Sequence, residues 1–172
     1  MSALVVYESL WGNTAAIAHA IGEGIGEDTL VHHTGEIEAA EAAAALLLVV
    51  GAPVHAFSLP SATTKKSVAE RPLAPGDIVP DLSQPPLRAW LEGLPAASGF
   101  AAAFDTRVRG PLGHGGASKI EKILVERGYS IANRSQGFYI INEKNVKAEG
   151  SMLRPGELDR AREWGRLLAS RV

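Results

Sequence analysis

A short turn near the start of the chain brings together residue types that suit an anion. An apolar run, residues 4–7, ends just before it, and a helical pattern begins directly after it. The start of a helix directs backbone N–H groups and a partial positive charge at one point in space. Hydroxyl and amide side chains add hydrogen bonds, and a glycine allows close approach of the backbone, so the turn predicts a phosphate site. The residues of this turn, here named the first loop, are Ser9, Leu10, Trp11, Gly12, Asn13 and Thr14.

The first loop contains no lysine or arginine, which argues against a nucleoside triphosphate with its Mg²⁺. The chain has no Gly-Lys pair, hence no Walker A loop, and neither a Gly-x-Gly-x-x-Gly nor a Gly-x-Ser-x-Gly motif. Its five histidines show no metal-ligand spacing, so no metal is expected. A simpler interpretation of the first loop stays open, because hydroxyl-rich turns begin many helices as plain N-caps.

A first strand followed by Ser-x-x-Gly-Asn-Thr, here Ser9 to Thr14, resembles the flavodoxin-like family, and most of all the flavodoxin modules of flavodiiron proteins. The resemblance implies flavin mononucleotide (FMN), bound non-covalently, with its phosphate held by hydroxyl and helix N–H groups and no basic residue. It also implies electron transfer by the flavin, whose potential the protein sets through loop contacts and charge. No side chain stands out as an acid, a base or a nucleophile, so no catalytic residue is named.

A second loop is expected beside the first, because ligands of doubly wound sheets lie beyond the carboxyl ends of the strands. It follows the third strand and opens with a Gly-x-Pro segment at Gly51, which resembles the same loop in flavodoxin-like proteins. The faces of His55 and Phe57 suit a flat isoalloxazine ring, and Phe57 equally suits a place in the core beneath the loop. The candidate cofactor-binding residues of this loop are Pro53, Val54, His55 and Phe57.

A third loop follows the fourth strand, and its candidate residues are Phe104, Asp105, Thr106 and Arg107. The resemblance implies that backbone N–H groups of residues 105–107 bind the pyrimidine edge of the flavin. Arg107 or Arg109 would stabilise negative charge at that edge on reduction, and the alternative is two solvated arginines. The second and third loops lack the tryptophan and tyrosine that often stack on the ring in the family, and no glycine lies between Gly51 and Gly76. A peptide flip that stabilises a one-electron state would cost more without glycine.

These loops need a sheet that brings them to one edge, and strand-like and helix-like segments alternate as in a parallel sheet with crossover helices. The prediction is a three-layer, doubly wound α/β fold with five parallel strands, and the order 2-1-3-4-5 comes from the resemblance and from right-handed crossovers. Strands are expected at residues 3–8, 29–33, 46–50, 100–104 and, as one interrupted strand, 130–132 with 138–141. Helices are expected directly after the first loop, over residues 36–45 and 87–94, and from residues 116 and 155.

Three local features accompany this pattern. The first helix should bury Ile17, Ile21 and Ile25 and end at Gly24 and Gly26. Residues 60–86 hold six prolines and exceed an ordinary connection, so they are either functional or partly mobile. The buried face of the last helix is expected to carry Leu158, Ala161, Trp164 and Leu168.

Composition narrows the class of protein. The 172 residues fit a single domain, here residues 1–172, and 46% are hydrophobic, as in a globular protein. A net charge of −2 argues against nucleic acid as a partner, and the weak acidity is unlike a mobile flavodoxin carrier. There is no cysteine and no signal-peptide pattern, and the longest apolar run, residues 42–54, is too short to span a bilayer. A cytoplasmic protein without membrane contact is expected, and its oligomeric state stays open.

Three functions remain compatible with the sequence. The first is an FMN-binding, flavodoxin-like electron-transfer protein that serves a redox partner protein or a small-molecule electron acceptor. The second is an FMN-dependent NAD(P)H:quinone-type oxidoreductase, in which residues 60–86 form a substrate wall or a dimer contact. The third is a binding domain that keeps the fold without the flavin.

Overall fold

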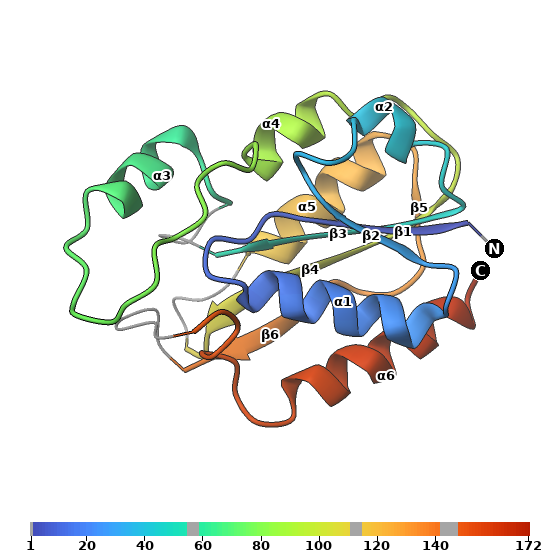
Figure 1. Cartoon of the computed structure of the whole chain (residues 1–172). Coiled ribbons are helices and arrows are strands. Elements are labelled where there is room, and N and C mark those ends of the chain that lie inside the picture. Colours follow the sequence, from blue (N-terminus) through green and yellow to red (C-terminus); the bar gives the residue numbers. More distant parts are fainter. Residues whose placement is uncertain (1, 55–58, 111–114, 142–147) are drawn as a thin grey trace.

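The structure is a computed structural model that describes residues 2–54, 59–110, 115–141 and 148–172 (Figure 1). His55 and Phe57, expected in the second loop, lie outside these residues. The strands are β1 (Ala3–Tyr7), β2 (Leu30–His33), β3 (Leu47–Pro53), β4 (Phe100–Val108), β5 (Ser130–Ile131) and β6 (Gln136–Ile140). The helices are α1 (Asn13–Ile25), α2 (Ala39–Ala42), α3 (Ala62–Ala69), α4 (Leu87–Glu92), α5 (Gly116–Glu126) and α6 (Glu157–Ala169).

All strands pair in parallel in one sheet, in the order β2-β1-β3-β4-β5, with β6 also paired to β4. This confirms the predicted doubly wound fold and its order. β5 lies beside the first residues of β4, where Phe100 pairs with Ser130, and β6 lies beside the last, where Phe104 pairs with Gln136. The fifth strand, predicted as one interrupted strand, is therefore two short strands, β5 and β6, that both pair with β4.

Helices cover both faces of the sheet in three layers (Figure 1). One face packs against α1 and α6, around Val5, Phe104 and Phe138. The other face packs against α2, α4 and α5, around Val50 and Leu91. β1 and β3 are buried along their whole length, which explains their continuous apolar sequences. None of the helices in the described parts of the chain is long and apolar enough to span a membrane.

Several predicted boundaries differ from the structure. The fourth strand continues to Val108, because β3 and β6 flank its last residues. Residues 36–45 contain only the short helix α2. Residues 60–86 contain helix α3, which begins at a capping box formed by Ser61 and Thr64. In α6 the predicted Ala161, Trp164 and Leu168 are buried, whereas Leu158 is exposed.

The crossing of α1 and α6 explains two glycines. α1 ends at Ile25 and Gly26 caps it, so Gly24 lies inside the helix and does not end it. A Cβ atom on Gly24 would lie 2.1 Å from the backbone oxygen of Arg162, and one on Gly165 would lie 2.3 Å from the backbone oxygen of Ile21. Close contact between the two helices therefore requires residues without a side chain at these positions.

Candidate anion-binding site at the start of helix α1

The first loop joins β1 to α1 and leaves hydrogen-bonding groups without partners. Gly12, the N-cap of α1, has a φ of 78° and provides no side-chain cap, and the first turn carries no acidic residue. Ser9 is 3% exposed, and its Oγ has no hydrogen-bond partner among the described residues. A buried hydroxyl beside an uncapped helix start is an arrangement that an anion would satisfy.

The other polar side chains of the first loop form hydrogen bonds with other segments of the protein. Thr14 Oγ1 forms a 2.7 Å hydrogen bond with Thr106 Oγ1 on β4. Asn13 Oδ1 accepts a hydrogen bond from the backbone N–H of Met152 at 3.1 Å. Ser9 and the backbone N–H groups of the first turn are therefore the better candidates for binding a phosphate.

Leu10 and Trp11 are both buried, although they lie in a loop. They pack against Val68, Ile78 and Leu82 from residues 60–86, here named the cover segment, and against Met152. The backbone N–H of Asp81 also donates to the carbonyl of Leu10 at 2.8 Å. The cover segment thus packs directly against the first loop, and a role for it as a substrate wall or a dimer contact stays a prediction.

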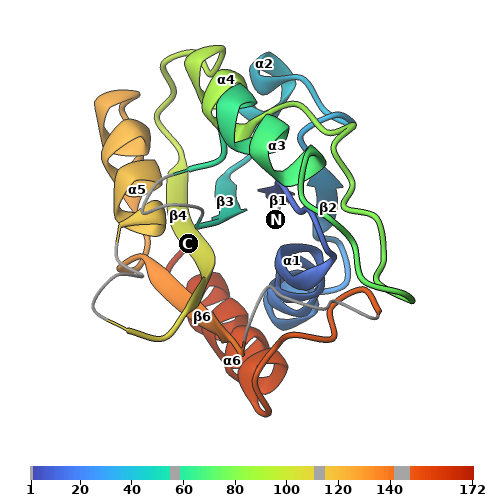
Figure 2. The ribbon, with the colours of Figure 1, turned by 90° about the vertical axis from the view of Figure 1, so that its left-hand side faces the viewer.

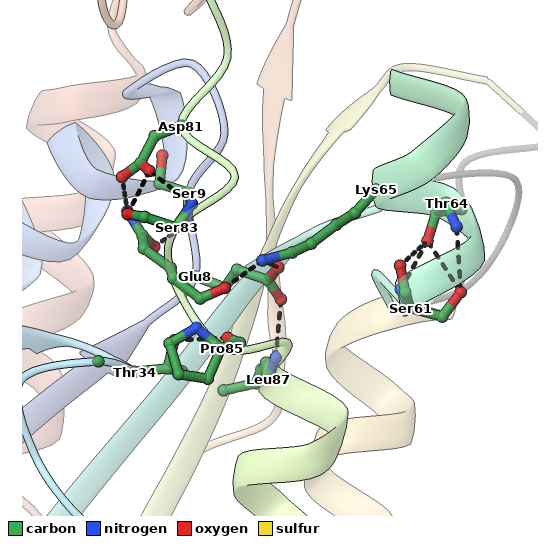
Figure 3. Close-up of polar contacts among 12 residues, drawn as sticks. Glu8, Ser9, Thr34, Ser61, Thr64, Lys65, Asp81, Ser83, Pro85 and Leu87 are labelled. Carbon is green, nitrogen blue, oxygen red and sulfur yellow. Dashed lines mark hydrogen bonds and ion pairs between the residues drawn. The ribbon is translucent and has the colours of Figure 1, made fainter. Parts of the chain in front are cut away.

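Polar side chains that the sequence analysis missed tie the cover segment to the end of β1 (Figure 3). Glu8 is fully buried, with its Oε1 3.1 Å from Lys65 Nζ and its Oε2 accepting from the backbone N–H of Leu87 at 2.8 Å. Lys65 Nζ also donates to the carbonyl of Gln84, and Gln84 Oε1 accepts from the backbone N–H of Ser9 at 2.9 Å. One signal for this contact is present in the sequence, the carboxylate of Glu8 directly after an apolar strand. No residue near Glu8 in the sequence predicted Lys65 as its partner.

Asp81 shapes the turn that presents Gln84. Its Oδ1 accepts from the backbone N–H and the hydroxyl of Ser83, at 2.9 and 2.6 Å, and its Oδ2 accepts from Gln84 Nε2 at 2.8 Å. Burial by itself raises the pKa of Asp81, but these hydrogen bonds outweigh it and lower the pKa. The pKa of Tyr7, at the end of β1, is raised. The main cause is burial, followed by the nearby charges of Glu36, Asp81 and Glu149.

The candidates of the third loop lie in strand β4. Phe104 is part of the core, and Asp105 Oδ2 accepts from the backbone N–H of Ala117 at 2.8 Å and from Arg107 Nη1 at 3.3 Å. Thr106 contacts both other loops, because its hydroxyl bonds Thr14 and its carbonyl accepts from the N–H of Val54 at 2.9 Å. Asp105 and Arg107 thus have structural partners, and flavin binding by the backbone of residues 105–107 stays a prediction.

The three expected loops do meet at one edge of the sheet. Pro53 pairs with Thr106, and the ends of β1, β3 and β4 lie together at the edge that faces the viewer in Figure 2. α3 of the cover segment lies at this same edge, where Lys65 reaches Glu8. Arg109 is exposed, with its guanidinium carbon 5.9 Å from the centre of the Tyr139 ring. No three metal-ligating side chains gather in the part of the chain that the structure describes.

The strand order and the loops at this edge define a doubly wound α/β protein whose strand order reverses between β1 and β3. Solved flavodoxins share this architecture. Flavodoxin 2 from Bacillus cereus is 16% identical with a TM-score of 0.69, covering 100% of both chains. A flavodoxin from the domain Archaea is 20% identical with a TM-score of 0.63, covering 99% of this chain and 97% of the other.

The flavodiiron core of Flv1 from Synechocystis sp. PCC6803 is also similar, at 15% identity and a TM-score of 0.59. The match covers 98% of this chain and 35% of the longer one. No protein-family model matches the sequence, and no curated protein matches it. The chain therefore has the flavodoxin-like fold, as the resemblance of its first loop implied.

Proposed function

We propose that this protein binds FMN at the first loop and transfers electrons to a redox partner protein or a small-molecule acceptor. One observation carries the proposal: α1 begins without a side-chain cap beside the buried, unpartnered Oγ of Ser9. A phosphate monoester fits this donor set, because its oxygens would accept from the hydroxyl and from the N–H groups of the first helical turn. FMN, when bound, would supply the electron chemistry, and the residues of this chain would bind and orient it.

The position of the phosphate group restricts where the rest of FMN would lie. Thr14 and Val54 both contact Thr106, so the first and second loops border the end of β4. A ligand anchored at Ser9 would extend along this edge, which agrees with ligand placement at the strand-order reversal of doubly wound sheets. Pro53, Val54 and Thr106 are the described residues best placed to border it. The names of the similar structures, which are flavodoxins, support the same cofactor.

The decisive experiment compares FMN with riboflavin, which lacks the phosphate. The purified protein is titrated with each, and binding is followed by the shift of the visible flavin bands. We expect FMN to bind much more tightly. Ser9→Ala should weaken FMN binding about 10- to 100-fold, because a hydrogen bond to a charged group contributes about 1.5–3 kcal/mol, and should leave riboflavin binding unchanged. Ser118→Ala, an exposed hydroxyl in α5, is the matched control and should change neither.

Other outcomes decide between the remaining functions. A wild-type protein that takes up neither flavin at high concentration would overturn the proposal and favour a flavin-free binding domain. With FMN bound, stepwise reduction without oxygen separates the other two functions. Two resolved one-electron steps support an electron carrier, whereas a single two-electron step supports a quinone-type reductase.

A further inference from the structure

A buried negative charge lies next to the proposed phosphate site. Glu8 is 0% exposed and directly precedes Ser9, so its carboxylate lies within about 10 Å of the Ser9 side chain. The first loop itself has no basic residue that would offset this charge. Like charges at such a distance repel appreciably in a partly buried site, because water screens them poorly there. An anion would therefore bind weakly beside Glu8 unless another group neutralised it.

Lys65 is that group, and it comes from the cover segment. Its Nζ lies 3.1 Å from Glu8 Oε1, and the residue is 9% exposed. The same ammonium donates to the carbonyl of Gln84, whose side-chain oxygen accepts from the N–H of Ser9. Lys65 therefore neutralises Glu8 and also fixes the residue that orients the Ser9 backbone. The neighbouring Lys66 does neither, because its side chain is 77% exposed and faces Glu70.

We propose that Lys65 is a positioning residue for anion binding: paired with Glu8, it makes the first loop selective for a phosphorylated flavin over riboflavin. The inference rests on the proposed function, since it concerns the same site. Lys65 acts through Glu8 and Gln84 and not as a direct phosphate ligand. Its effect is electrostatic, so it applies to FMN, which carries a phosphate, and not to riboflavin, which carries no charge.

The test measures the dissociation constants of FMN and riboflavin for Lys65→Met, Glu8→Gln and the double variant. Lys65→Met should weaken FMN about tenfold and change riboflavin less than about twofold, since only FMN meets the unpaired carboxylate. Adding Glu8→Gln should restore most of the lost FMN affinity, because the repelling charge is gone. Lys66→Met is the matched control and should behave like the wild type.

Glu8→Gln alone keeps the inference testable if Lys65→Met fails to fold. This variant retains Lys65 without its carboxylate partner, so it should bind FMN about threefold more tightly than the wild type and riboflavin equally. Equal losses of FMN and riboflavin in Lys65→Met, or no gain of FMN in Glu8→Gln, would overturn the inference. A wild-type protein that binds no FMN would instead overturn the proposed function itself, so the two failures are distinguishable.

Discussion

Helices α1 and α5 begin in the same way, yet their first turns meet different partners. Both start after a glycine in the left-handed region, Gly12 with a φ of 78° and Gly115 with a φ of 113°, and neither glycine provides a side-chain cap. At α5, Asp105 on β4 accepts the N–H of Ala117 at 2.8 Å. At α1, Gly12 has no side chain to take this place, and the first turn carries no acidic residue. The carboxylate of Asp105 therefore occupies the start of α5, whereas the start of α1 is suited to an anion from outside the chain.

A third helix supports this contrast. α6 also begins after a left-handed glycine without a side-chain cap, Gly156, but it carries Glu157 and Asp159 in its first turn. These carboxylates interact favourably with the positive end of the helix. α1 lacks acidic residues in its first turn. The loop motif alone therefore does not define an anion site, because a helix start is open to an external anion only where no carboxylate of the chain already occupies it.

The largest effect on stability is expected when the carboxylate at the start of α5 is removed. Asp105→Ala should lower the free energy of unfolding by about 3 kcal/mol, because the N–H of Ala117 and the guanidinium of Arg107 lose a buried partner. Urea unfolding followed by circular dichroism measures the loss. Asp159→Ala serves as a control, because the Asp159 side chain is 88% exposed and should matter little. A loss below about 1 kcal/mol would mean that the start of α5 does not depend on its carboxylate.

An intermediate effect is expected from a matched pair of glycine substitutions. Gly12→Ala and Gly115→Ala both place a side chain at a positive φ, which costs about 1–2 kcal/mol of stability. A Cβ on Gly12 would also lie 2.8 Å from Glu149 Cβ, whereas one on Gly115 would meet only Lys119 Cε at 4.0 Å. Gly12→Ala should therefore be the more destabilising by about 1 kcal/mol in urea unfolding. Equal losses would show that the chain around Glu149 moves aside readily.

The smallest effect concerns acid. Hydrogen bonds from Ser83 and Gln84 lower the pKa of Asp81 in the folded state, so its contribution to stability is present above its unfolded pKa of about 4. That contribution is lost as the pH falls through the lower folded pKa. Thermal unfolding at pH 7 and pH 3 should show the difference between wild type and Asp81→Asn shrinking in acid. The change is small because water screens this exposed group. A difference that does not depend on pH would contradict the role assigned to the Asp81 carboxylate.

Features that depend on neighbouring residues could be predicted from the amino-acid sequence. The apolar sequences at residues 3–8 and 46–50 predicted strands, and β1 and β3 overlap these ranges and are buried along their whole length. The residues of the first loop indicated a turn into a helix, and α1 begins at Asn13. The resemblance carried by this loop implied the fold that the sheet confirms. The cofactor, the single domain and the cytoplasmic location stay predictions.

The partners of the polar side chains could not be predicted from the sequence, because many of them come from distant segments of the chain. The packing of α1 against β4 brings the hydroxyl of Thr14 to that of Thr106, a contact that the sequence did not predict, and phosphate binding by Thr14 stays a prediction. Asp105 was expected in a loop, but β3 and β6 extend the strand around it and place its carboxylate at α5. Lys65 meets Glu8 only because the cover segment folds back over the end of β1. Hydrophobic periodicity records which face of an element is buried, whereas the pairing of charges depends on contacts between segments far apart in the chain.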